Sequence, residues 1–116
     1  IRSLEGNIEY LQTNLDLSSS AFTLIIKGCS MEPEFSEGDA VVIDPNVFPL
    51  PGDFVVAKNG EDEALFKKYR PRGIIAGNEV FELVPLNADY PVLRSDSSEI
   101  RIVGTMMEHR KYRRRR

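Results

Sequence analysis

The sequence is poor in the residues that hold disulfide-bonded and metal-binding domains together. Among its 116 residues it has one cysteine, Cys29, and one histidine, His109. A single cysteine forms no internal disulfide, and one histidine beside it is too few for a metal cage. We therefore expect no metal and no cofactor, and the low cysteine content fits the reducing cytoplasm.

Long apolar runs are also missing. The longest, such as residues 54–57, have the length of a strand, whereas a membrane-spanning helix needs about 20 apolar residues in succession. Charged side chains at Arg2, Glu5 and Glu9 stand where a signal peptide would have its apolar core. The sequence thus predicts no contact with a membrane and a cytoplasmic location.

The overall composition is that of one globular domain. Hydrophobic residues make up 41% and charged residues 28%, which excludes a disordered or collagen-like chain. The charges are unevenly placed: residues 1–108 hold all 18 acidic and nine basic residues, a net charge of −9, and residues 109–116 add +6. The acidic body is a poor DNA-reading surface. The basic end is an arm that touches nucleic acid or an acidic partner, or simply a solvated tail, which is the commoner case.

Short apolar runs separated by turn residues predict an all-β domain. No apolar stripe at helical spacing persists beyond about ten residues. Closely spaced strands joined by tight turns, including a hairpin at Asn59-Gly60, favour strongly bent antiparallel sheets that form a partly closed barrel. We expect an N-terminal arm over residues 1–21, a folded domain over 22–108 and a basic tail over 109–116. The expected strands are residues 22–27, 40–43, 54–58, 64–69, 73–76, 80–84, 92–93 and 99–108.

Ser30 follows the first of these strands within the turn at residues 28–33. Turns at strand ends can expose a side chain together with free backbone N–H groups, as a nucleophile with an oxyanion site requires. Most serines in such places are ordinary turn residues, so a base has to be found. His109 lies beside a cationic run that would oppose its protonation without positioning it.

A lysine held neutral can serve as the base instead, and the strand at residues 64–69 supplies Lys67 and Lys68. Successive side chains of a strand face opposite sides, so one of the two turns inward. Phe66 shares a face with Lys68, and Leu65 shares the other with Lys67. Alternation does not decide which face is buried.

With these residues in view, the chain resembles the self-cleaving C-terminal domains of LexA, UmuD and lambdoid phage repressors, which are Ser-Lys peptidases. The likeness covers about residues 22–108. The resemblance implies that Ser30 is the nucleophile, that Lys67 is the general base, that the backbone at Ser30 and Met31 supports the oxyanion, and that Lys68 faces solvent. The matching segments, in the family's order, are residues 28–31 with 37–39, 51–57, 63–68, 81–93 and 102–104.

Residues 86–91, Leu-Asn-Ala-Asp-Tyr-Pro, favour the phage repressor branch, although Asn87 and Tyr90 are also ordinary turn residues. Cys29 departs from the family, which has a polar residue before the serine. No histidine or acid is placed to activate Cys29 as a nucleophile.

The family's scissile Ala-Gly or Cys-Gly bond lies upstream of the serine, and no such dipeptide precedes Ser30. Ala76-Gly77 is expected to be a turn. The absence implies that this chain is the fragment left by cleavage, or begins close to that point. The resemblance further implies a homodimer, an activating RecA–single-stranded DNA filament after DNA damage, and operator DNA bound only through a missing N-terminal helix-turn-helix.

Lysine is a poor base unless it is buried, because a pKa near 10.4 leaves about one molecule in 2,500 neutral at pH 7. Dry surroundings without a carboxylate can lower that pKa by roughly 3–5 units. Three other functions stay open: a UmuD-like accessory subunit of a lesion-bypass polymerase, a signal-peptidase-like protease, and an interaction module whose peptidase has decayed.

Overall fold

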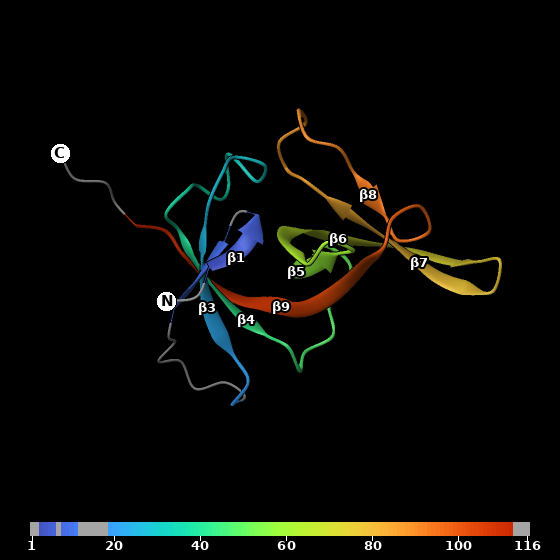
Figure 1. Cartoon of the computed structure of the whole chain (residues 1–116), viewed down its shortest axis with the longest axis horizontal. Coiled ribbons are helices and arrows are strands. Elements are labelled where there is room, and N and C mark those ends of the chain that lie inside the picture. The colour runs from blue at the N-terminus through green and yellow to red at the C-terminus, as the bar shows by residue number, and fades with distance from the viewer. Residues whose placement is uncertain (1–2, 7, 12–18, 113–116) are drawn as a thin grey trace.

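The structure, a computed structural model, describes residues 3–6, 8–11 and 19–112, with side chains from residue 19 onward (Figure 1). This part of the chain contains nine strands and no helix, so none that could cross a membrane. The all-β prediction is confirmed. The strands are β1 (Ser3–Gly6), β2 (Ile8–Leu11), β3 (Phe22–Ile26), β4 (Ala40–Asp44), β5 (Phe54–Asn59), β6 (Glu63–Ile75), β7 (Asn78–Val84), β8 (Leu93–Arg94) and β9 (Ile100–Arg110).

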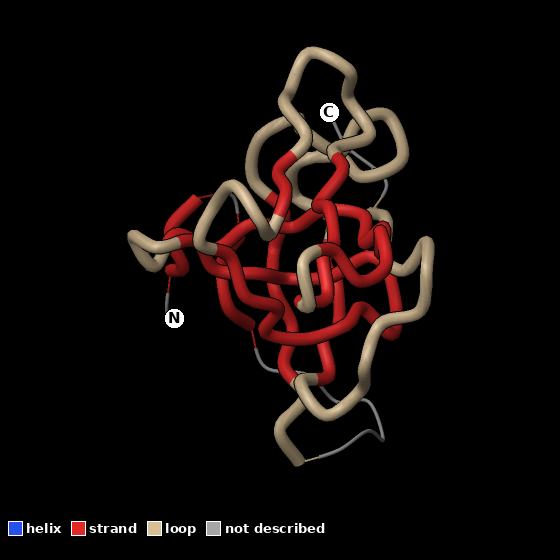
Figure 2. Tube along the Cα trace, turned by 90° about the vertical axis from the view of Figure 1, so that its right-hand side faces the viewer, coloured by secondary structure: helices blue, strands red, loops and turns tan. Residues whose placement is uncertain are grey.

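The strands form one sheet in the order β1-β2-β3-β4-β9-β5-β6-β7-β8, and every neighbouring pair is antiparallel. The long strand β9 curves through the molecule, pairing with both β4 and β5 (Figure 1). Bulges at Val42/Ile43 and Val56/Ala57 lie on those two partners, and bulges bend and twist a strand. Strands occupy the centre and loops the outside (Figure 2).

A short parallel contact also joins β1 to β6, through the pairs Glu5 with Glu63 and Gly6 with Ala64. The expectation of a partly closed barrel stays a prediction. So does the division into arm, domain and tail. The segment expected as an arm contributes β1 and β2 to the sheet, and β9 runs to Arg110, past the expected start of the tail. Residues 1–2, 7, 12–18 and 113–116 lie outside the described part of the chain.

Two strands that the sequence separated, at residues 64–69 and 73–76, form the single strand β6. The prediction of a separation was wrong, because Pro71 and Gly73 do not interrupt the strand. The sheet instead accommodates them at a register shift between Pro71 and Gly73, where a bulge tolerates a residue without an N–H. Ala76 and Gly77, both at positive φ, form the tight turn into β7, as expected.

Two apolar clusters cover the two faces of the β5–β6 ladder. Val56 and Phe66 are paired across the strands and pack into the larger cluster, whereas Val55, paired with Lys67, packs into the smaller one. Both faces of β6 are therefore covered, and Lys67 lies on the side of the smaller cluster. The larger cluster contains Leu24, Ile26, Met31, Phe35, Val41, Ile43, Val56, Ala64 and Phe66.

Candidate active site

The loop after β3 holds Ser30 between fixed points. Gly28, at a φ of 87°, turns the chain out of β3 in a conformation that favours glycine. The N–H of Glu32 donates to the carbonyl of Cys29 at 3.2 Å, which closes a four-residue turn around Ser30. Met31 and Phe35 are buried in the larger apolar cluster. The apolar side chains that follow the serine thus anchor the turn that presents it.

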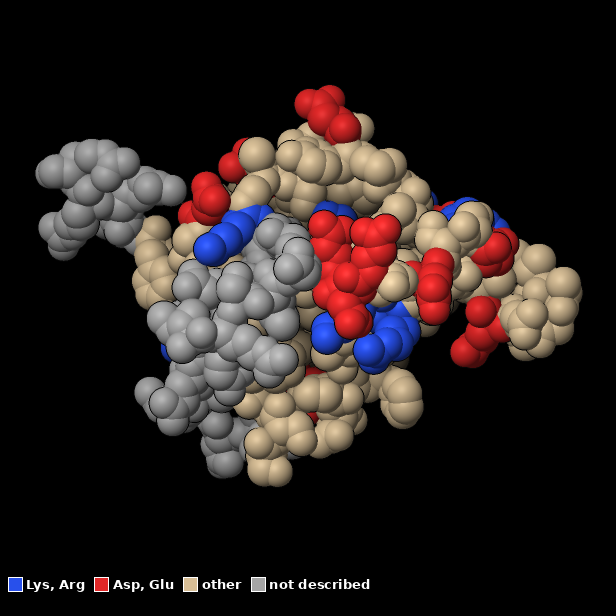
Figure 3. Space-filling model, viewed as in Figure 1, with Lys and Arg blue, Asp and Glu red and all other residues tan. Residues whose placement is uncertain are grey.

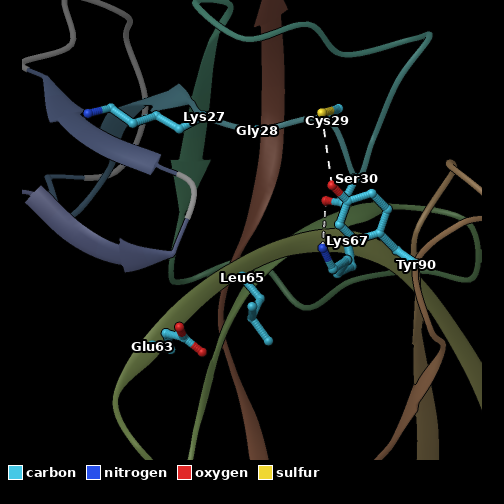
Figure 4. A pocket seen from close by; sticks show the side chains of 8 residues that line it. All are labelled: Lys27, Gly28, Cys29, Ser30, Glu63, Leu65, Lys67 and Tyr90. Atoms are coloured by element: carbon cyan, nitrogen blue, oxygen red, sulfur yellow. Dashed lines mark hydrogen bonds between the residues drawn. The ribbon is translucent and has the colours of Figure 1, made fainter.

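Lys67 reaches this turn from the middle of β6. Its Nζ lies 2.7 Å from Oγ of Ser30, a hydrogen bond between residues 37 positions apart (Figure 4). Ser30 is 6% exposed and Lys67 7%. The structure therefore brings together the two side chains that the sequence singled out as nucleophile and base.

No counter-charge accompanies Lys67 among the described residues. Burial alone lowers the pKa of Lys67 from 10.5 to about 8, since removing an ammonium group from water disfavours its charged form. Glu63, on the same strand, accepts a hydrogen bond from Nδ2 of Asn59 instead. At pH 7 about one Lys67 in ten would be neutral, against about one in 3,000 for an ordinary lysine. The neutral amine can accept the proton of the Ser30 hydroxyl.

Ser30 and Lys67 open into a cleft of about 210 Å³. The cleft wall is mixed, with the apolar side chain of Leu65 below the lysine and the ring of Tyr90 across from it (Figure 4). A substrate carbonyl could approach the serine from this side. The lining residues are Lys27, Gly28, Cys29, Ser30, Glu63, Leu65, Lys67 and Tyr90.

Asn87 and Tyr90 are the residues that sequence reasoning placed in a turn without bringing them to the serine. The turn is present, because the N–H of Tyr90 donates to the carbonyl of Asn87 at 3.1 Å. Asn87 also donates from its backbone N–H to the carbonyl of Ser30 at 3.0 Å and from Nδ2 to the carbonyl of Cys29 at 3.1 Å. The Tyr90 hydroxyl donates to Sγ of Cys29 at 3.9 Å. The segment at residues 86–91 was the available signal, but nothing local in it predicts these contacts.

The other sequence candidates lie apart from the Ser30–Lys67 contact. Lys68 faces the opposite side of β6 and is partly exposed, and the side chain of Met31 points into the core, so only its backbone could serve the site. His109 binds Oδ2 of Asp39 at 2.9 Å and packs on Phe35, with ring centroids 4.3 Å apart. Cys29 is exposed beside the cleft, and its described contacts include neither a histidine nor an acid.

Comparisons with known proteins identify a family and two similar proteins. The family model described as Peptidase S24-like matches residues 1–107. Repressor protein C2 of Salmonella phage P22 is 35% identical over 101 residues, which is 83% of this chain and 44% of the phage protein. An uncharacterized HTH-type transcriptional regulator of Coxiella burnetii is 37% identical over 67 residues, 57% of this chain and 31% of the regulator. The chain thus spans less than half the length of these two curated relatives.

Proposed function

Since the chain belongs to the S24-like peptidase family, as its resemblance predicted, we propose that it is the self-cleaving C-terminal domain of a phage-type transcriptional repressor. Ser30 is its nucleophile and Lys67 its general base. The observation that carries the proposal is the 2.7 Å contact between their buried side chains, with burial alone lowering the pKa of the lysine. The names of the two relatives favour a repressor over a polymerase accessory subunit or a signal peptidase.

The proposed reaction follows from the proton positions. Neutral Lys67 takes the hydroxyl proton as Oγ of Ser30 bonds to the substrate carbonyl carbon, and the carbonyl oxygen becomes an oxyanion held by the N–H groups of Ser30 and Met31. The C–N bond then breaks, and Lys67 gives its proton to the leaving amine. Water hydrolyses the acyl-enzyme, which releases the carboxylic acid and restores the Ser30 hydroxyl.

The substrate we propose is a segment of the longer repressor that enters the cleft, so that cleavage separates this domain from a helix-turn-helix. Operator DNA would bind only through that other domain. The acidic body supports this division, because residues 1–108 carry a net charge of −9. On the face seen in Figure 3, acidic side chains gather near the centre and on the right, and a smaller basic group lies directly below the central one. Phosphate backbones would be repelled by such a surface.

Two partners belong to the same proposal. One is a second copy of the chain, and the other is a RecA–single-stranded DNA filament that promotes cleavage. An activator can raise the rate only by binding the cleavage-competent arrangement more tightly than the resting one.

The β1–β6 contact supports a partly closed barrel as the frame for the cleft.

Labelling of Ser30 by a fluorophosphonate tests the assignment in the chain as it stands. The probe forms an Oγ–P bond with loss of fluoride, and the hydroxyl proton passes to Lys67. We expect Ser30→Ala to abolish labelling and Lys67→Ala to slow it by about 10²–10⁴-fold. Lys68→Ala is the matched control and should stay near the wild-type rate. Normal labelling of Lys67→Ala with loss in Lys68→Ala would refute the assignment. The same variants in the longer repressor report on self-cleavage.

A further inference from the structure

Asn87 is tied to the serine turn at two successive carbonyls. Its backbone N–H donates to the carbonyl of Ser30 at 3.0 Å, and its Nδ2 donates to the carbonyl of Cys29 at 3.1 Å. The other end of the amide is also occupied, because Oδ1 accepts the N–H of Asp89 at 3.0 Å. The Asn87 side chain is thus fixed at both ends, and it bridges two loops 58 residues apart.

The orientation of these two carbonyls fixes the orientation of the N–H groups of Ser30 and Met31. In a planar trans peptide the C=O of one residue points opposite to the N–H of the next. The Cys29 carbonyl therefore sets the direction of the Ser30 N–H, and the Ser30 carbonyl sets that of the Met31 N–H. Both N–H groups point away from Asn87, and neither donates to an acceptor among the described residues.

We propose that Asn87 is a positioning residue for the oxyanion site. By holding the Cys29 and Ser30 carbonyls, it aims the N–H groups of Ser30 and Met31 at the oxygen that gains charge during attack. The inference rests on the proposed function, in which those two groups hold the oxyanion. Preorganised donors of this kind lower the barrier because they need no reorientation as the charge develops.

The hydrogen-bond chemistry requires an amide at this position. One end of the side chain must accept from Asp89 and the other must donate to Cys29. An aspartate has nearly the same shape and keeps the acceptor for the Asp89 N–H. In place of Nδ2, however, it would set a carboxylate oxygen against the Cys29 carbonyl oxygen, and the two would repel each other. Asn87→Asp therefore reverses one contact and leaves the turn chemistry in place, whereas Asn87→Ala removes both side-chain contacts.

The test is the second-order rate of fluorophosphonate labelling in the full 116-residue chain. We expect Asn87→Asp and Asn87→Ala to label about 10–100-fold more slowly than wild type, less than the loss of a whole oxyanion donor. Asn46→Ala, at an exposed asparagine outside the cleft, is the matched control and should label at the wild-type rate.

Two further measurements separate positioning from folding. A carbon-13 label at Cε of Lys67 reports its titration, and thermal unfolding reports stability. We expect Asn87→Ala, which adds no charge near the amine, to leave the Lys67 midpoint near 8, because none of the described Asn87 contacts reaches Nζ. A midpoint that moves toward 10.5 together with a lower Tm would show that the lysine has become hydrated, and would overturn the inference in favour of a structural role.

The labelling rates also keep the two proposals apart. If wild type labels no faster than Ser30→Ala, the proposed function fails and this inference fails with it. If wild type labels at Ser30 and Asn87→Ala does so equally fast, the inference alone is overturned. Slower labelling of both Asn87 variants, with the Lys67 midpoint and Tm of Asn87→Ala unchanged, is the supporting result.

Discussion

Lys67 and Asp39 are both ionisable and both buried, at 7% and 3% exposure, yet their surroundings differ completely. Within the described part of the chain, Lys67 has one side-chain partner, the uncharged hydroxyl of Ser30. Oδ2 of Asp39 accepts from the N–H of Ser36 at 3.0 Å, from Nε2 of His109 at 2.9 Å and from Nζ of Lys111 at 3.1 Å. One charge is left alone in the interior and the other is surrounded by donors.

The pKa is lowered at both sites, with opposite meanings. At Lys67 burial lowers the pKa, so the folded protein disfavours the charged form. At Asp39 burial raises the pKa, but the donors from Ser36, His109 and Lys111 outweigh it, so the folded protein favours the charged form. The Asp39 cluster therefore stabilises the fold at neutral pH, whereas Lys67 destabilises it and gains reactivity.

Replacing Lys67 and Asp39 by uncharged residues of similar size should change the free energy of unfolding in opposite directions. A pKa lowered from 10.5 to about 8 means that charged Lys67 destabilises the folded state by about 3 kcal/mol. A substitution that removes this charge also loses the hydrogen bond to Ser30, which offsets about 1 kcal/mol of the gain. We expect Lys67→Met to stabilise the chain by about 2 kcal/mol at pH 7. Asp39→Asn should destabilise it by a similar amount, because it leaves a cluster of donors without its anion. Urea unfolding measures both.

The pH dependence distinguishes these two effects. Below pH 8 Lys67 is charged in the folded and unfolded chain, so its cost is fully present. Between about pH 8 and 10.5 the folded state has lost its proton and the unfolded state has not, so wild-type stability rises and the advantage of Lys67→Met shrinks. For Asp39, the deficit of Asp39→Asn should shrink as pH falls below 3.8 and through the lower folded pKa. A Lys67→Met advantage that is constant up to pH 11 would contradict the buried, uncompensated lysine.

How far the sequence predicts this contrast depends on the range of the contacts. Ser30 and Lys67 were predictable because each lies in a segment that resembles the peptidase family. The burial of Lys67 was not, since alternation along β6 separates two faces and the structure covers both. Asp39 meets His109 only because β4 pairs with β9, 70 residues along the chain. Pairing of this kind is a property of the topology and not of a local pattern.

A carboxylate added beside Lys67 should make that site resemble Asp39. Leu65 lines the same cleft and lies on the same face of β6, two residues away. An opposite charge within about 4–6 Å of the amine raises the pKa of a lysine by about 1–3 units. We expect Leu65→Glu to move the midpoint of the pH–rate profile of Ser30 labelling from near 8 toward 10, and to slow labelling at pH 7 by about tenfold or more.

Leu65→Gln is the control, because it adds a polar side chain of the same size without a charge. Its midpoint should stay near the wild-type value, where labelling rises about tenfold per pH unit below pH 8. If the glutamate and glutamine variants share one profile, the amine at position 67 does not set the pH dependence, and its role as base would be lost.

The smallest change is expected where the Asp39 cluster reaches solvent. The side chain of Lys111 is 52% exposed, whereas that of Asp39 is 4% exposed, so water screens the pair from one side only. Lys111→Ala should destabilise the chain by at most about 1 kcal/mol, less than Asp39→Asn, because the Ser36 and His109 donors remain. The deficit should shrink further at high salt, which screens exposed charges but not the buried bonds. Lys58→Ala, at a lysine without an ion pair to any described residue, should change stability less still. If Lys111→Ala lost as much stability as Asp39→Asn, the Lys111 ammonium group alone would compensate the buried Asp39 carboxylate. The difference between the Asp39 and Lys67 sites would then come down to one surface lysine.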